Sequence, residues 1–186
     1  MQQWKAKEII LCALFTALTA IGAFIKIPVG TDVFTLQFLF TLLAGLLLGG
    51  KMGAASVGIY VLLGLIGVPV LANGGGPGYI LQPTFGYLIG FVLQAWFNGT
   101  MSRRAINITV KNLLGVNLGG MLIVYIFGLA YFYIISNYVI ATPIAWWTLI
   151  LYGGILQMPG DFLLCYLAAI LGVRLYKAGI WVNLKA

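Results

Sequence analysis

One acidic residue of this chain lies deep inside an apolar segment, where a carboxylate is costly. Asp161 stands in ILQMPGDFLLCYL, 13 residues before Arg174. At about 1.5 Å per residue, a helix places it roughly 20 Å from the basic end of the segment. A charge at that depth costs several kcal/mol unless it is paired, hydrogen-bonded or facing water. A protonated side chain or a bond to a neighbouring helix would also explain the residue, but we favour an aspartate that binds a ligand.

A second polar side chain accompanies Asp161. Gln157 precedes it by about one helical turn, so both lie on the same helix face. Between them, Pro159 and Gly160 are expected to kink the helix and free backbone groups, which suits the wall of a cavity.

Further polar residues gather near two other apolar segments. Thr35 and Gln37 are expected to open the second helix, and Gln82, Thr84 and Tyr87 the fourth. The last three lie within an irregular stretch, NGGGPGYILQPTFGYLIGF, at 73–91. Taken singly, each fits a contact between helices. Their convergence at one end of a bundle favours a small-molecule pocket over an interfacial belt of aromatic residues and turn glycines.

Composition identifies the class of protein that must position these residues. The 186 residues are 62% hydrophobic and 7% charged, and the mean hydropathy is +1.08. Soluble domains carry roughly a quarter charged residues, so we predict an all-α integral membrane protein forming one membrane domain over 1–186. Six transmembrane helices are expected, at about 8–26, 35–49, 52–71, 84–101, 113–135 and within 147–176. The second is short for a full span, so we expect helices 2 and 3 to be tilted or partly shielded by neighbours.

The basic residues predict the orientation. With both ends in the cytoplasm, nine of the ten Lys and Arg residues lie inside and only Lys26 lies outside, as the positive-inside rule requires. The nine are Lys5, Lys7, Lys51, Arg103, Arg104, Lys111, Arg174, Lys177 and Lys185. Three irregular connections then face outward, at 25–34, around 73–83 and at 136–147. Irregular backbone at membrane level survives where it lines a cavity or is covered by protein.

Several function classes find little support. The net charge of +7 flanks apolar runs and forms no stripe, so we expect no nucleic-acid partner. The chain has no histidine, no HExxH motif, no nucleophile elbow and no P-loop, so we expect neither an enzyme nor an ATPase. Cys12 and Cys165 have no metal or redox spacing around them.

The first helix carries a face of small residues. Ala13, Ala17 and Ala20 are spaced by four and three in LCALFTALTAIGAF, which lets another helix approach closely. Packing within the bundle would use the same pattern.

The stretch GGGPGYILQPTFGYLIGF closely resembles the signature of the BioY family, the biotin-specific substrate-binding (S) components of energy-coupling factor (ECF) transporters. The resemblance continues through residues 35–75 and MPGDFLLCYLAA at 158–169. It implies the six-helix S-component fold in a bacterial cell membrane, with biotin captured from outside. It also implies docking, through Ala13 and Ala17, onto a transmembrane coupling protein of the EcfT type that two ABC-type ATPase subunits drive. We expect no cofactor, biotin being the transported ligand, and no metal.

The resemblance also assigns a binding site. An ionised Asp161 would accept from a ureido N–H of biotin, and Gln37, Gln157 or Thr35 would bond the ureido carbonyl. The family carries a lysine three residues after the aspartate, where this chain has Leu164. Asn73, the N–H groups of 74–76 or Lys26 are therefore candidates for the biotin carboxylate. The full set of expected substrate-binding residues is Thr35, Gln37, Asn73, Gly75, Gly86, Tyr87, Trp146, Gln157 and Asp161, with Phe34 and Trp147 as further walls. An S component for riboflavin or thiamin and a solitary biotin facilitator remain alternatives.

Overall fold

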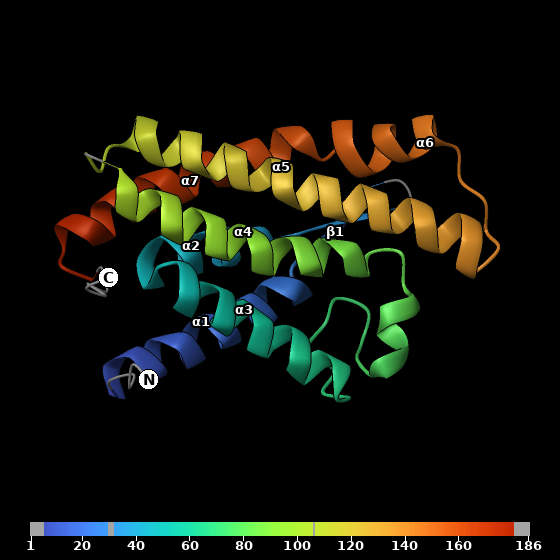
Figure 1. Ribbon diagram of the computed structural model, residues 1–186, viewed down its shortest axis with the longest axis horizontal. Helices are drawn as coiled ribbons and strands as arrows, with labels where there is room; N and C mark the ends of the chain where they lie inside the picture. The colour runs from blue at the N-terminus through green and yellow to red at the C-terminus, as the bar shows by residue number, and fades with distance from the viewer. Residues whose placement is uncertain (1–5, 30–31, 106, 181–186) are drawn as a thin grey trace.

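The computed structural model describes residues 6–29, 32–105 and 107–180, so Lys5 and Lys185 lie outside the described part. It is a bundle of helices with a short hairpin and irregular loops at one end (Figure 1). The long helices are α1 (Ala6–Phe24), α2 (Gln37–Leu48), α3 (Gly50–Leu65), α4 (Phe85–Arg104), α5 (Val110–Ile134) and α7 (Met158–Lys177). The short elements are β1 (Lys26–Val29), β2 (Asp32–Thr35), η1 (Pro77–Leu81), η2 (Ile135–Val139), α6 (Trp146–Ile150) and η3 (Leu151–Ile155). The predicted all-α bundle of six helices is confirmed, with α6, η3 and α7 as one broken segment.

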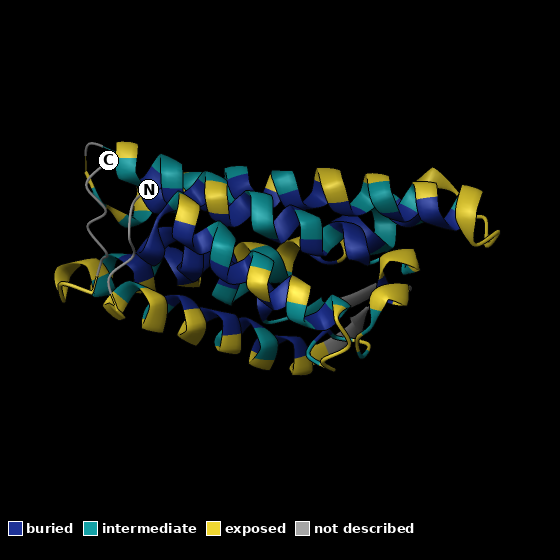
Figure 2. Ribbon diagram, turned by 60° about the horizontal axis from the view of Figure 1, so that its bottom comes forward, coloured by how far each residue is buried: buried dark blue, intermediate teal, exposed yellow. Residues whose placement is uncertain are grey.

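The outer surface of the bundle is apolar. Large side chains such as Ile10, Leu122 and Phe162 are exposed along their helices, and Figure 2 shows exposed residues along the outward faces while buried ones turn inward. Helices that are apolar on all sides belong in lipid or in a large core. Among the described residues, three helical stretches are long and apolar enough to cross a membrane, at Ala6–Phe24, Val110–Val139 and Trp146–Lys177.

The short helix α2 lies at the centre of the bundle and packs against α1, α3, α4 and α7. Most of its residues are buried, so the predicted shielding of helix 2 is confirmed. Glycines allow this close packing: a Cβ on Gly53 would come within 2.8 Å of Gly45 Cα, and one on Gly99 would collide with the backbone of Gly49 and Gly50. Arg103 adds a cap, because its Nη2 donates to Leu47 O at 3.0 Å at the carbonyl end of α2.

Several predicted boundaries are wrong, each at the irregular end. Helix 3 ends at Leu65 instead of 71, because Gly67 has a φ of +110° and Pro69 disfavours helix in the residue before it. Helix 2 begins at Gln37, and Thr35 instead pairs with Lys26 in the β1–β2 hairpin. The 136–147 connection is helical at both of its ends, since η2 continues α5 to Val139 and α6 begins at Trp146, and only 140–145 is irregular.

The last segment has the expected break close to Asp161. A π-helical stretch, η3, contains Gly153 and Gly154, and a turn at 156–157 precedes α7. Pro159 follows in the first turn of α7, where its missing N–H costs nothing. The hairpin, the loop after α3 and the 140–145 connection all lie at the end of the bundle opposite the start of α1 and the end of α7 (Figure 1).

Candidate functional site

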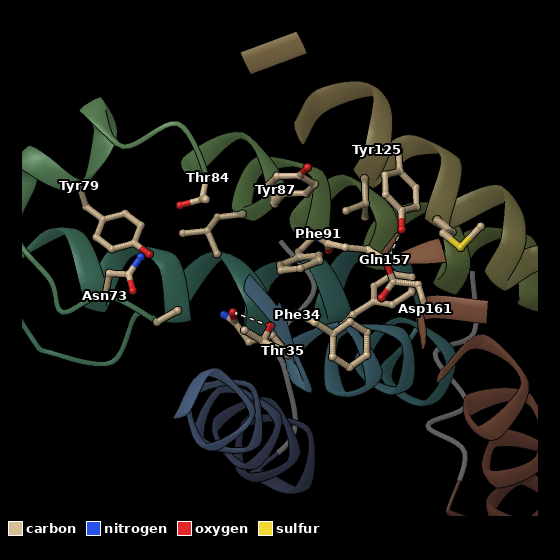
Figure 3. Close-up of a pocket in the computed structure, with 16 residues that line it drawn as sticks. Phe34, Thr35, Asn73, Tyr79, Thr84, Tyr87, Phe91, Tyr125, Gln157 and Asp161 are labelled. Atoms are coloured by element: carbon tan, nitrogen blue, oxygen red, sulfur yellow. Dashed lines mark hydrogen bonds between the residues drawn. The ribbon is translucent and has the colours of Figure 1, made fainter. Parts of the chain in front are cut away.

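A pocket opens between the hairpin, the loop after α3, the N-terminal ends of α2, α4 and α7, and the middle of α5 (Figure 3). It contains about 680 Å³ of space, including space open to solvent. The lining residues are Phe34, Thr35, Gln37, Phe38, Ala72, Asn73, Tyr79, Thr84, Tyr87, Leu88, Phe91, Met121, Val124, Tyr125, Gln157 and Asp161. Aromatic and aliphatic walls with a few polar groups are what a ligand pocket needs.

One end of the pocket holds the carboxylate. Asp161, in the first turn of α7, accepts a hydrogen bond of 2.5 Å at Oδ2 from the Tyr125 hydroxyl on α5. Gly160 makes room for the aromatic wall beside it, because a Cβ there would come within 2.8 Å of Phe34 Cε2. In Figure 3 the Phe34 ring lies next to Asp161. The N-terminus of α7 also favours a negative charge at this position.

Gln157 adds a donor at the same end. Its side chain is only 7% exposed, and its Nε2 has no hydrogen-bond partner among the described residues. Buried polar groups are nearly always bonded, so an orphan amide in a pocket wall indicates a place for a ligand acceptor. The Asp161 amide N–H donates to Gln157 O at 3.1 Å, which holds the two residues one turn apart.

The middle of the pocket carries a hydrogen-bonded chain. Thr35 Oγ1 donates to Gln37 Oε1 at 3.1 Å, and Gln37 Nε2 donates to the Tyr60 hydroxyl at 2.5 Å. Gln37 and Tyr60 are both buried. Thr35 and Gln37 therefore line the pocket as predicted, with the Gln37 amide held by protein on both sides.

The opposite end is formed by the loop after α3. Figure 3 shows Asn73, Tyr79 and Thr84 at the far side of the group from Tyr125 and Asp161. Lys26 ties this loop to the hairpin by donating from Nζ to Ala72 O at 2.9 Å. Gly74 and Gly76 each have a φ of +109°, which explains the glycine run, because other residues rarely adopt this conformation.

Two tyrosines join α4 and α5 above the pocket. Tyr87 packs on Gly128 and donates to Gly153 O at 3.1 Å, and it lines the pocket as predicted. Tyr131 packs on Gly86 and donates to Ile80 O at 2.6 Å. Gly86 therefore serves helix packing, since any side chain there would collide with Tyr131.

Three predicted site residues lie outside the pocket wall, although their role toward a ligand stays a prediction. Gly86 lies under Tyr131, and Gly75 faces the Val68 carbonyl. Trp146 is half exposed and stacks on Tyr133 with ring centroids 4.2 Å apart. Trp147, a suggested wall, is 71% exposed. Of the nine predicted residues, the structure brings together Thr35, Gln37, Asn73, Tyr87, Gln157 and Asp161.

Sequence reasoning missed the contribution of α5. Met121, Val124 and Tyr125 line the pocket and have the three-and-four spacing of one helix face. The Tyr125 hydroxyl, in the middle of an apolar span, was the feature of the sequence that could have indicated this contribution. Tyr79 and Phe91 were also missed, the first because the loop that carries it has no periodicity.

The small-residue face of α1 lies on the surface. Ala13 and Ala17 are exposed and line an apolar groove between α1 and α3. Beneath it the two helices are joined by Thr16 Oγ1, which donates to Ser56 O at 2.9 Å, and by Ser56 Oγ, which donates to Cys12 O at 2.9 Å. Tyr60, the acceptor for Gln37, also lines this groove. Within the described part of the chain, no cluster of potential ligands suits a metal ion.

Comparison with known proteins gives a consistent family. Residues 1–180 match the sequence model of the BioY family. A probable biotin transporter BioY of Lysinibacillus sphaericus is 42% identical over 177 residues, covering 95% of this chain and 90% of that protein. A biotin transporter BioY of Rhizobium etli is 32% identical over 184 residues, covering 90% and 92%.

The fold is also similar to a solved structure. A crystal structure described as the S-component for biotin from an ECF-type ABC transporter aligns with a TM-score of 0.80 and 30% sequence identity. The alignment covers 92% of this chain and 91% of that one. The predicted S-component fold is therefore confirmed.

Proposed function

This chain belongs to the BioY family, and we propose that it is the S component of an ECF-type importer that captures biotin in the pocket between the hairpin and α7. One observation carries this proposal: an acceptor, Asp161, and an unpartnered donor, Gln157 Nε2, stand together at one end of an otherwise largely apolar pocket. The ureido group of biotin offers the matching pattern, with N–H donors beside a carbonyl acceptor. Its thioether ring and aliphatic tail match the walls formed by Phe34, Phe91 and Met121.

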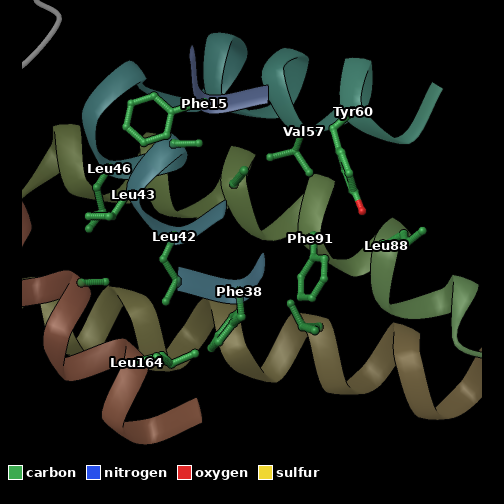
Figure 4. Close-up of a cluster of buried hydrophobic side chains, with 14 of the residues drawn as sticks. Phe15, Phe38, Leu42, Leu43, Leu46, Val57, Tyr60, Leu88, Phe91 and Leu164 are labelled. Carbon is green, nitrogen blue, oxygen red and sulfur yellow. The ribbon is translucent and has the colours of Figure 1, made fainter. Parts of the chain in front are cut away.

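The ligand then lies along the pocket. The ureido head takes the end with Asp161, and the carboxylate takes the opposite end near Asn73. No lysine or arginine is among the described lining residues, and Leu164 is buried in the apolar core (Figure 4). The Asn73 amide supplies a donor at this end, and Lys26, which is bonded to the neighbouring Ala72 carbonyl, supplies a positive charge.

The direct test is equilibrium binding of biotin to the purified chain in detergent, with riboflavin and thiamin as competitors. Selective binding of biotin without any partner supports the proposal. A folded sample that binds riboflavin or thiamin instead would assign the same fold to another vitamin, and the pocket assignment would need revision.

Uptake requires a second surface. We propose that the groove with Ala13 and Ala17 receives the coupling protein, because small residues there leave α1 open to close approach by another helix. The sequence contains no Walker motif, and we propose that ATPase subunits of that module supply the energy for uptake. The basic residues at the start of α1 and at the ends of α4 and α7 lie at the end of the bundle opposite the pocket. This arrangement supports the proposal that the pocket faces outward and that both ends of the chain lie in the cytoplasm.

Bulky residues in the groove test this surface. We expect Ala13→Trp with Ala17→Trp to abolish uptake of labelled biotin and co-purification with the coupling protein, while biotin binding is retained. Leu122→Trp with Ile126→Trp is the matched control, because these residues are exposed on α5 with the same spacing of four. Loss of biotin binding in the variant with tryptophan at positions 13 and 17 would show that this face packs within the bundle. Uptake without any coupling module would identify a solitary facilitator.

A further inference from the structure

Tyr125 contacts the side chain on which biotin recognition depends most. It lies on α5 with its ring buried, and it crosses to α7 to donate from its hydroxyl to Asp161 Oδ2 at 2.5 Å (Figure 3). A hydrogen bond from a hydroxyl to a carboxylate is short and roughly twice as strong as a neutral one. The bond therefore restrains both the rotation of the carboxylate and its distance from the pocket.

The restraint has a chemical consequence. A carboxylate that accepts from Tyr125 is held in one orientation, and in its ionised form it offers acceptors only. A carboxylic acid would present an O–H, and a donor would then face the N–H donor of the ligand. A carboxylate has about four lone-pair sites, so the bond from Tyr125 is compatible with a further bond from the ligand.

We propose that Tyr125 is a positioning residue that determines the specificity of this pocket for a ureido N–H, by holding Asp161 as an oriented acceptor. Gln157 Nε2, one turn before Asp161, supplies the complementary donor for the ureido oxygen. The inference rests on the proposed biotin function. It goes further because it names the residue that lets the pocket distinguish a ureido N–H from a ureido nitrogen without its hydrogen.

A double-mutant cycle tests the proposal on the intact chain in detergent. Biotin dissociation constants are measured for the parent, Tyr125→Phe, Asp161→Asn and the double variant. We expect Tyr125→Phe to bind biotin about tenfold more weakly, since a charge-assisted bond is lost. We expect the double variant to bind no more weakly than Asp161→Asn alone, because Tyr125 acts through the carboxylate. Tyr131→Phe is the matched control: it lies on the same helix, but its hydroxyl donates to Ile80 O outside the pocket wall.

A ligand series separates positioning from simple packing. Biotin methylated on a ureido nitrogen lacks one N–H, so the ratio of its dissociation constant to that of biotin measures N–H recognition. We expect this ratio to fall in Tyr125→Phe and to stay at the parent value in Tyr131→Phe. A purely structural role for Tyr125 would weaken both ligands equally.

The outcomes are distinct. If the parent does not bind biotin, the proposed function fails. If the parent binds biotin and Tyr125→Phe binds it equally tightly, only the inference on Tyr125 fails. The same conclusion follows if the losses of affinity in the two single variants multiply in the double variant. Should Tyr125→Phe not fold, the infrared difference spectrum between the parent and Asp161→Asn decides. A carboxylate band supports the proposal, and a carboxylic acid band for Asp161 overturns it.

Discussion

Replacing Asp161 by asparagine removes a charge from the pocket with almost no change in volume. In the structure the side chain is partly buried, accepts from Tyr125 and lies beside Phe34 and Gln157. The asparagine amide can still fill this space, but one of its two polar atoms is a donor. The bonds to the ligand and to Tyr125 both lose their ionic character.

The size of the effect follows from the bond to the ligand. A hydrogen bond to a charged group contributes about 1.5–3 kcal/mol to stability or binding. Since about 1.4 kcal/mol is a factor of ten, Asp161→Asn should weaken biotin binding roughly 10- to 150-fold. Desthiobiotin retains the ureido group and lacks the sulfur, so its affinity should fall by the same factor.

Isothermal titration calorimetry on the purified variants measures this directly, and thermal unfolding without ligand checks that the variant is folded. Thiamin and riboflavin serve as negative controls. Unchanged biotin affinity in a folded Asp161→Asn would refute the charged-acceptor role. A loss for biotin with none for desthiobiotin would place the carboxylate near the thioether ring instead of the ureido group.

Two further variants test other features of the structure. Gln157→Met removes the unpartnered buried Nε2, whose burial costs about 1–3 kcal/mol. We therefore expect a higher unfolding temperature without ligand and about tenfold weaker biotin binding by calorimetry. A lower unfolding temperature would show that the amide is bonded within the protein. Gly99→Ala should destabilise the chain by about 1–3 kcal/mol through overpacking against Gly49 and Gly50, whereas Gly58→Ala on α3, where a Cβ meets nothing within 4 Å, should be neutral or slightly stabilising in the same thermal unfolding assay.

The class of protein, the number of long helices and the most informative polar residue could all be predicted from the amino-acid sequence. With 7% charged residues the chain cannot make a water-facing surface. Asp161 stands out in the printed sequence because a carboxylate in an apolar segment is costly wherever the helix faces. The glycine-rich block, which indicated the family, also has a local physical cause. Gly74 and Gly76 adopt a backbone conformation that other residues rarely reach.

The pairs of residues that contact each other across the pocket could be identified from the folded structure alone. Tyr125 joins Asp161 from a helix 36 positions away along the chain, and Thr35 enters the pocket from a hairpin in place of a helix. Trp146, by contrast, looked like a pocket wall but stacks on Tyr133. The reason is physical: a helix in lipid is apolar on its outer face as well as its inner one, so hydrophobic periodicity does not reveal which face points inward. That choice is made by packing between elements, through contacts such as Tyr87 of α4 on Gly128 of α5 and Phe34 of β2 on Gly160 of α7.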